Sequence, residues 1–143
     1  MSDLDLETAR RIVAGARAHA RDAGFKPMTV VVLDAGGHVV AAEREDGSSN
    51  KRFEIGFGKA HGALSLGMGS RSLMTRAEQQ PYFIAAVTSA VGGALVPVPG
   101  GVLVRDADGT LLGAVGITGD TSDNDEAAAV AGIESAGLTA QVD

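Results

Sequence analysis

Apolar residues recur at spacings of three and four near the start of the chain, which is the period of an amphipathic helix. The recurring positions are Leu6, Ala9, Val13, Ala16 and Ala20. Gly24 is expected to end this helix, because glycine readily takes the left-handed conformation found at helix C-termini. Pro27 then prevents the helix from continuing.

Two pairs of short apolar runs, each joined by a tight turn, predict two β-hairpins. Residues 29–33 form an unbroken apolar run, residues 34–37 read Asp-Ala-Gly-Gly, and residues 38–44 return as the partner strand. Later in the chain, the turn at residues 106–109, Asp-Ala-Asp-Gly, lies between two runs rich in valine and leucine. Because tight turns join antiparallel neighbours, both pairs are expected to be antiparallel.

Two helical regions separate the hairpins. The first is expected over about residues 51–68, and the second covers residues 70–91. Pro81 must interrupt the second region or start a new helix, and Thr75 to Glu78 has the form of a capping box. The core stripe of the first region would consist of Phe53, Phe57, Ala60 and Leu64. A connection rich in glycine and proline follows over residues 92–101.

A last helix is predicted after a break at Thr118-Gly119. Asp123 to Glu126 has capping-box form, and Gly137 can end the helix. The acids here do not match a calcium loop, which requires glycine where Asp125 stands, so we expect them to cap the helix. The order α-β-β-α-α-β-β-α predicts an α/β fold of the α+β kind, in one domain over residues 1–143.

The composition narrows the class of partner. The chain has 143 residues, 45% of them apolar, and a net charge of −6 from 12 basic and 18 acidic residues. It has one Tyr, no Trp and no basic block, so nucleic acid is not expected as a partner. No apolar run reaches about 18 residues, and the first residues lack an apolar signal core, so we expect a cytoplasmic protein without a membrane partner. Cysteine is absent, which removes disulfides and thiolate metal sites.

One candidate site is a face of the helix predicted over residues 51–68, where small residues and one imidazole share a side. These are Gly58, His61, Gly62, Ser65 and Gly69. A flat cofactor, a substrate or another helix could approach such a face closely. Tight packing with a partly exposed His61 is the alternative. The other histidines are His19 and His38; no pair has zinc-site spacing, although a haem needs only one or two axial ligands.

Two further places carry candidate chemistry. Arg44 at the end of the second strand could bind a carboxylate in a forked geometry, and Glu45 could act as a general base if burial raises its pKa. A solvated turn is the alternative there. At the strand-to-helix junction, the backbone N–H groups of Thr118 and Gly119 could hold a small polar or anionic ligand.

Six short motifs form a collinear pattern over nearly the whole chain. The first half carries Met28-Thr-Val-Val-Val-Leu-Asp-Ala-Gly-Gly-His-Val-Val-Ala, Arg44-x-Asp46-Gly47 and Lys59-Ala60. The second half carries Pro99-Gly-Gly-Val-Leu-Val-Arg-Asp, Gly113-Ala-Val-Gly-Ile-Thr-Gly, and Asp125-Glu126 followed by Ala131-Gly132. This pattern resembles the GlcG/HbpS-like haem-binding family, which includes the C-terminal domain of PduO-type cobalamin adenosyltransferases.

The resemblance implies a profilin-like fold, with an antiparallel sheet of about five strands covered by helices, and a homo-oligomer such as a dimer-based tetramer or octamer. It also implies haem or a related tetrapyrrole as the ligand, with His61 or His19 as the iron ligand. The residues expected to contact a small-molecule ligand are Arg44, Lys59, His61, Gly100, Gly101, Thr118 and Gly119.

Two alternatives stay open. The family commonly has an apolar residue where Glu45 stands and a larger residue near Gly62, and both differences suit a smaller polar or carboxylate-bearing metabolite. In that case the protein would be an acid–base enzyme, catalysing isomerisation or hydrolytic ring opening with Glu45 and His61 as catalytic residues and Arg44 orienting the substrate. The other alternative is a structural oligomer subunit without its own ligand.

Overall fold

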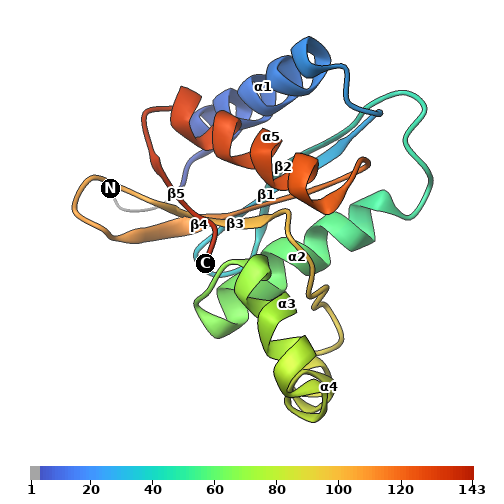
Figure 1. Ribbon diagram of the computed structural model, residues 1–143. Coiled ribbons are helices and arrows are strands. Elements are labelled where there is room, and N and C mark those ends of the chain that lie inside the picture. The colour runs from blue at the N-terminus through green and yellow to red at the C-terminus, as the bar shows by residue number, and fades with distance from the viewer. Residues whose placement is uncertain (1–3) are drawn as a thin grey trace.

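A five-stranded antiparallel sheet with helices on both faces makes up the protein in the computed structural model, which describes residues 4–143 (Figure 1). The strands, in the spatial order β2-β1-β4-β3-β5, are β1 (Thr29–Asp34), β2 (Val39–Arg44), β3 (Gly101–Arg105), β4 (Leu111–Thr118) and β5 (Thr139–Gln141). The helices are α1 (Leu6–Ala23), α2 (Arg52–Leu66), α3 (Ser70–Gln79), α4 (Pro81–Ala90) and α5 (Ser122–Ser135). The predicted fold class and element order are confirmed, with the region 70–91 divided at Pro81. The prediction about a signal core includes residues 1–3, which lie outside the described residues.

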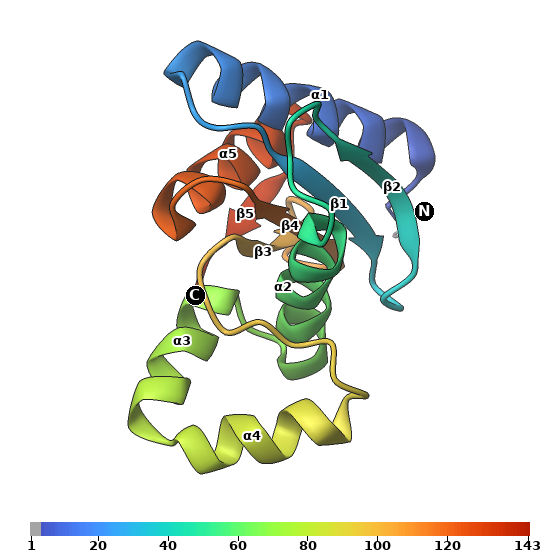
Figure 2. The same ribbon diagram turned by 90° about the vertical axis from the view of Figure 1, so that its right-hand side faces the viewer.

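The sheet separates two apolar layers. Successive side chains of a strand point to opposite faces, so Val30 and Val32 pack with α1 and α5, whereas Val31 and Leu33 pack with α2. Figure 2 shows α1 and α5 together above the sheet and α2 below it. Because β1 has neighbours on both edges and helices on both faces, its sequence is an unbroken apolar run instead of an alternating one.

Glycines bring the helices very close to their neighbours. On α2, Gly56 lies against Gly116 of β4, where a Cβ on Gly116 would overlap the Gly56 carbonyl oxygen. On α5, a Cβ on Gly132 would lie 2.5 Å from the Ile12 carbonyl oxygen of α1. The high glycine content therefore serves packing between elements as well as turns.

Helices α3 and α4 form an arm that extends away from the sheet (Figure 2). Pro81 occupies the first turn of α4, where its missing N–H costs nothing. Leu73 and Ile84 of the arm pack with Leu95 in a small apolar cluster of their own. No helix within residues 4–143 is long and apolar enough to cross a membrane.

Two predicted helix caps are wrong. Helix α3 already begins at Ser70, so Thr75 lies in its interior, where its hydroxyl donates to the Arg71 carbonyl oxygen at 3.3 Å. Helix α5 is capped by Thr121, whose Oγ1 accepts the Asn124 N–H at 3.2 Å, two residues before the predicted cap at Asp123. Asp125 is instead buried, because it makes tertiary contacts that a short sequence pattern does not predict.

Candidate functional site

Helix α2 buries the predicted core stripe only in part: Ala60 is buried, and Phe57 and Leu64 pack against the apolar cluster. The buried residues of α2 are Gly56, Gly58, Lys59, Ala60, Gly62 and Ala63, whereas Phe53 is 37% exposed. A Cβ on Gly58 would lie 2.7 Å from a Val96 methyl group, and one on Gly62 would lie 2.9 Å from Leu95 Cγ. The glycine face predicted to receive a ligand or a helix is therefore covered by the connection between α4 and β3.

Three rings stand on successive turns of α2, and we call Phe53, Phe57 and His61 the aromatic row. The ring centroids of Phe53 and Phe57 lie 5.9 Å apart, and those of Phe57 and His61 lie 5.2 Å apart with the planes only 19° from parallel. The spacing of four residues puts the rings on one helix face. Phe53 is exposed and Phe57 and His61 are half-buried, so the row is partly accessible to solvent.

The hydrogen bond of His61 indicates the tautomer of its neutral ring. Its Nδ1 lies 2.9 Å from the Ala94 carbonyl oxygen. A carbonyl oxygen only accepts, so Nδ1 carries the proton and Nε2 of the neutral ring keeps its lone pair. Metal-binding histidines typically donate their second N–H to a carbonyl or carboxylate in this way. The hydrogen bond to Ala94 thus holds the His61 ring in one orientation.

The other histidines lie elsewhere. His19 is exposed on α1, on the opposite side of the sheet from α2, and packs edge-on against Phe25 with ring centroids 5.8 Å apart. His38 is exposed beside the β1–β2 turn, where its Nδ1 lies 3.1 Å from Asp34 Oδ1. His19 therefore lies apart from the other two, whereas His61 lies near the turn that His38 follows, since a Cβ on Gly37 would be 3.5 Å from His61 Cδ2.

Glu45 is buried under α1. Its carboxylate accepts the Met28 N–H at 2.8 Å and Arg17 Nε at 3.1 Å, and Arg21 lies 3.3 Å away. The hydrogen bond with Glu45 is the largest cause that raises the pKa of Arg17. Since His61 stands on α2 across the sheet, the structure separates the two residues that the acid–base hypothesis combined.

Lys59 and Asp125 form a buried ion pair between α2 and α5. Their side chains are each 2% exposed, and Lys59 Nζ lies 3.1 Å from Asp125 Oδ2 and 2.9 Å from the Ile117 carbonyl oxygen. Burial lowers the pKa of the Lys59 ammonium and raises the pKa of the Asp125 carboxyl, and the opposite charge offsets part of each shift.

Gly100 and Gly101 pack directly against this pair. Gly100 has φ +124°, and a Cβ there would lie 2.8 Å from Lys59 Nζ. Gly101 donates its N–H to Ser70 Oγ at 2.7 Å, and a Cβ on it would overlap the Lys59 carbonyl oxygen. Lys59, Gly100 and Gly101, which were expected to contact a ligand, thus pack directly against one another.

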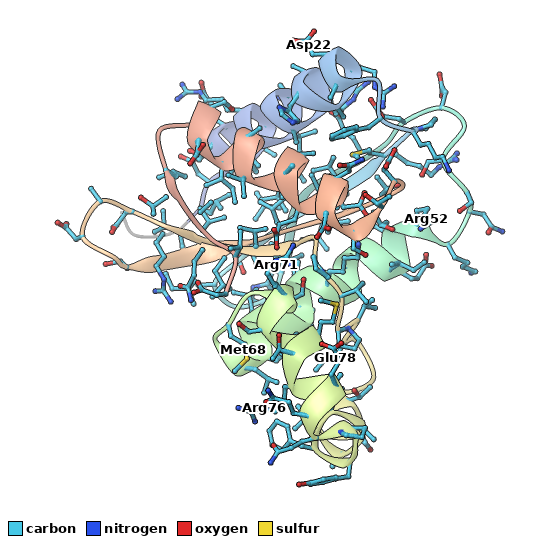
Figure 3. The ribbon with its side chains drawn as sticks, viewed as in Figure 1. Asp22, Arg52, Met68, Arg71, Arg76 and Glu78 are labelled. Carbon is cyan, nitrogen blue, oxygen red and sulfur yellow. The ribbon has the colours of Figure 1, made fainter. Side chains whose placement is uncertain are left out.

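Arg71 extends this polar layer from α3 to α5. It lies 3.0 Å from both carboxylate oxygens of Glu126 and 2.6 Å from Asp123. These hydrogen bonds raise the pKa of Arg71. Figure 3 labels Arg71 where α3 meets the first turn of α5. The acids predicted to cap α5 therefore mainly join it to α2 and α3.

Arg52 is a functional candidate that the sequence reasoning missed. From the first turn of α2 it donates to Thr118 Oγ1 at 2.8 Å and to Ser49 Oγ at 3.0 Å (Figure 3). Arg44, which was expected to bind a carboxylate, donates to the Ser48 carbonyl oxygen at 2.8 Å. No sequence signal distinguishes Arg52 from its neighbours, because the contact joins residues 66 positions apart.

These features define a small α+β protein with a helix-covered antiparallel sheet and one histidine oriented beside a row of aromatic rings. The chain belongs to the HbpS-like family, whose model, described as haem degrading protein HbpS-like, matches residues 4–134.

Solved structures share the fold over most of the chain. A PduOC:haem complex has a TM-score of 0.83 and 23% identity, covering 95% of this chain and 96% of its own. HbpS has a TM-score of 0.77 and 28% identity, covering 91% and 87%. A double mutant of Streptomyces reticuli HbpS has a TM-score of 0.78 and 27% identity, covering 92% and 86%. No match was found among functionally curated protein sequences.

Proposed function

We propose that this protein binds haem, or a related tetrapyrrole, on the aromatic row with His61 as the axial ligand. The observation that carries the proposal is the Nδ1 hydrogen bond to Ala94, which leaves Nε2 with its lone pair. Membership of the HbpS-like family and the fold shared with a PduOC:haem complex support the same ligand class.

The residues present fit a tetrapyrrole. Haem iron takes a histidine nitrogen as an axial ligand, and the porphyrin needs flat apolar surface around it. His61 supplies the nitrogen, and Phe57 and the 37% exposed Phe53 supply apolar side chains on the same face of α2. Bound haem would supply iron redox chemistry, while the protein orients the imidazole through the Ala94 carbonyl group.

Titration of the purified protein with haemin, followed through the Soret band, tests this proposal. We expect a saturable band for the wild-type protein. His61→Ala should weaken haemin binding by tenfold or more, because the iron loses its nitrogen ligand. His38→Ala is the matched control, since that ring is exposed and occupied by Asp34.

The outcomes separate the open alternatives. Loss of the band in His19→Ala, with His61→Ala unaffected, would transfer the ligand role to His19 on α1. A wild-type protein without a saturable band would overturn haem binding and return the ligand-free oligomer subunit as the better hypothesis. The acid–base alternative would have to use Glu45 or His61 singly, because the two residues lie on opposite faces of the sheet.

We also infer that the protein forms a homo-oligomer through its α3–α4 arm. Helix α4 is apolar nearly all round and packs on α3, which leaves Tyr82 71% exposed. Exposed apolar surface of this kind marks protein–protein contacts. A second copy of the chain is the partner that the family resemblance implies.

A further inference from the structure

A small cavity lies where four segments meet: the entry to β1, the loop before α2, the first turn of α2 and the β4–α5 turn. Its volume is about 190 Å³, and its walls include Lys26, Ser48, Ser49, Arg52 and Gly119. We call it the Arg52 pocket. It has no residue in common with the aromatic row. Arg52 and His61 are nine positions apart, which is about two and a half turns of α2, so they lie on opposite sides of the helix.

Arg52 is prepared to bind an anion. Its Nε and Nη1 are held by the hydroxyl groups of Ser49 and Thr118, which orient the guanidinium without neutralising its charge. Within residues 4–143 no carboxylate lies within ion-pair distance of Arg52, and its Nη2 has no protein hydrogen-bond partner. A guanidinium presents donors in a fork that matches the oxygens of a carboxylate or phosphate.

The surrounding charges leave the pocket positive. Lys26 is the second cation of the lining. The nearby acid is Asp120, whose oxygens accept the N–H groups of Lys26 and Thr121, both at 2.7 Å, and the Asn124 amide at 2.9 Å. These donors lower the pKa of Asp120 to about 2, so it stays ionised and engaged outside the lining. Lys26, Arg52 and Asp120 together carry one net positive charge at neutral pH.

The walls are held in place by contacts that do not occupy the cavity. Ser48 is buried, with its hydroxyl 2.8 Å from Thr29 Oγ1, and Arg44 binds the Ser48 carbonyl oxygen from outside. Gly119, with φ +150°, packs where a Cβ would overlap the Pro27 carbonyl oxygen. The loop and the turn therefore face each other across a space that already exists without a ligand.

We propose that the Arg52 pocket binds a small oxyanion, namely the phosphate or carboxylate group of a metabolite. A cavity of about 190 Å³ is below the range of roughly 300–1,000 Å³ typical of sites for drug-sized ligands, so it fits an anionic head group and not a tetrapyrrole. Arg52 supplies the forked contact, Lys26 supplies the second charge, and the Ser49 hydroxyl supplies a neutral partner. Nothing in this site depends on haem.

The test is a titration of the haem-free protein with inorganic phosphate and, separately, with acetate, at constant ionic strength held with chloride. Amide shifts of Gly47, Ser49 and Gly119 in ¹H–¹⁵N spectra report the binding. We expect saturable shifts with one of the two anions, which also identifies the head-group class. Arg52→Gln should weaken binding roughly tenfold or more, because a charged hydrogen-bonding group is lost.

Two further variants test whether the anion binds in the Arg52 pocket. Lys26→Gln should weaken binding by a smaller factor, without touching α2. Lys51→Gln removes the same charge one residue from Arg52, but Lys51 pairs with Glu54 outside the pocket, so binding should be unchanged. Equal weakening by Lys51→Gln and Arg52→Gln, or shifts that never saturate with either anion, would overturn the pocket assignment. Haemin binding by Arg52→Gln should match wild type, so failure here is distinguishable from failure of the haem proposal.

Discussion

Lys59 carries a buried charge: its ammonium group belongs to a side chain that is 2% exposed, and among residues 4–143 Asp125 is the one acid that forms an ion pair with it. Replacing one partner leaves the other charge buried and unpaired, which costs about 3–5 kcal/mol. We therefore expect Lys59→Met and Asp125→Asn each to lower the free energy of unfolding by about that amount. Urea denaturation of the variants measures this effect.

The double variant tests whether the pair acts as a unit. With neither charge present, the combined loss should be clearly smaller than the sum of the two single losses. Asn is the suitable replacement, because its amide oxygen can still accept the Asp120 N–H that Asp125 Oδ1 accepts at 2.9 Å. Strictly additive losses would show that Lys59 and Asp125 contribute through other contacts.

At the residue scale, the sequence predicted candidate residues but not the partners that hold their side chains. Lys59, Gly100 and Gly101 were expected to contact a ligand, and no local pattern reveals that they pack against one another with Lys59 pointing into the interior. Glu45 was expected to act as a general base at a strand end, and it forms ion pairs with Arg17 and Arg21 of α1. Such partners are set by which elements pack together, and one sequence does not encode that in any short pattern.

At the scale of elements, the contact between α2 and β4 depends on two glycines, Gly56 and Gly116, which differ in how much room a Cβ would have. A Cβ on Gly116 would overlap the Gly56 carbonyl oxygen, which is backbone and cannot rotate away. A Cβ on Gly56 would lie 3.3 Å from the Gly116 carbonyl oxygen and from a Val31 methyl group. The same contact therefore provides both a severe and a mild substitution.

We expect Gly116→Ala to lower the free energy of unfolding by about 3 kcal/mol or more, because α2 must shift away from the sheet. Gly56→Ala should change it by no more than about 1 kcal/mol, because the gain in helix propensity offsets part of the tight contact. Chemical denaturation of both variants compares them directly. Similar losses in the two variants would contradict this account of the interface.

Elements with strong local signals were predicted well. Gly24 and Gly109 have φ +72° and +84°, as their predicted roles at a helix end and a turn require. The exception is β5, whose three residues pair with β3 and show no strand pattern of their own. The predicted core stripe of α2 is also buried only in part, because its phenylalanines are partly exposed while glycines and Lys59 turn inward. Hydrophobicity alone favours the phenylalanines for the core, whereas close packing here requires small residues.

At the scale of the whole molecule, the arrangement of the hairpins is a tertiary property. Each hairpin follows from its turn, but the pairing of β1 with β4 joins residues from opposite ends of the chain. That pairing brings the β4–α5 turn beside the loop before α2 and creates the Arg52 pocket. The same arrangement leaves the α3–α4 arm outside both apolar layers, with apolar surface at Tyr82 that no element within the described residues covers.

The arm leads to a prediction about assembly. Sedimentation velocity over a range of concentrations should show wild-type protein at a multiple of the 14.4 kDa chain mass. Tyr82→Asp should weaken association tenfold or more, because buried tyrosines often dominate interface energies and a carboxylate is costly to desolvate.

The control is Ala107→Asp, which adds the same charge at the exposed β3–β4 turn and should leave association unchanged. Circular dichroism should show the same helix content in all three proteins, since Tyr82 is 71% exposed. A wild-type protein that sediments as a monomer at every concentration, or a Tyr82→Asp variant that associates like wild type, would contradict assembly through the arm.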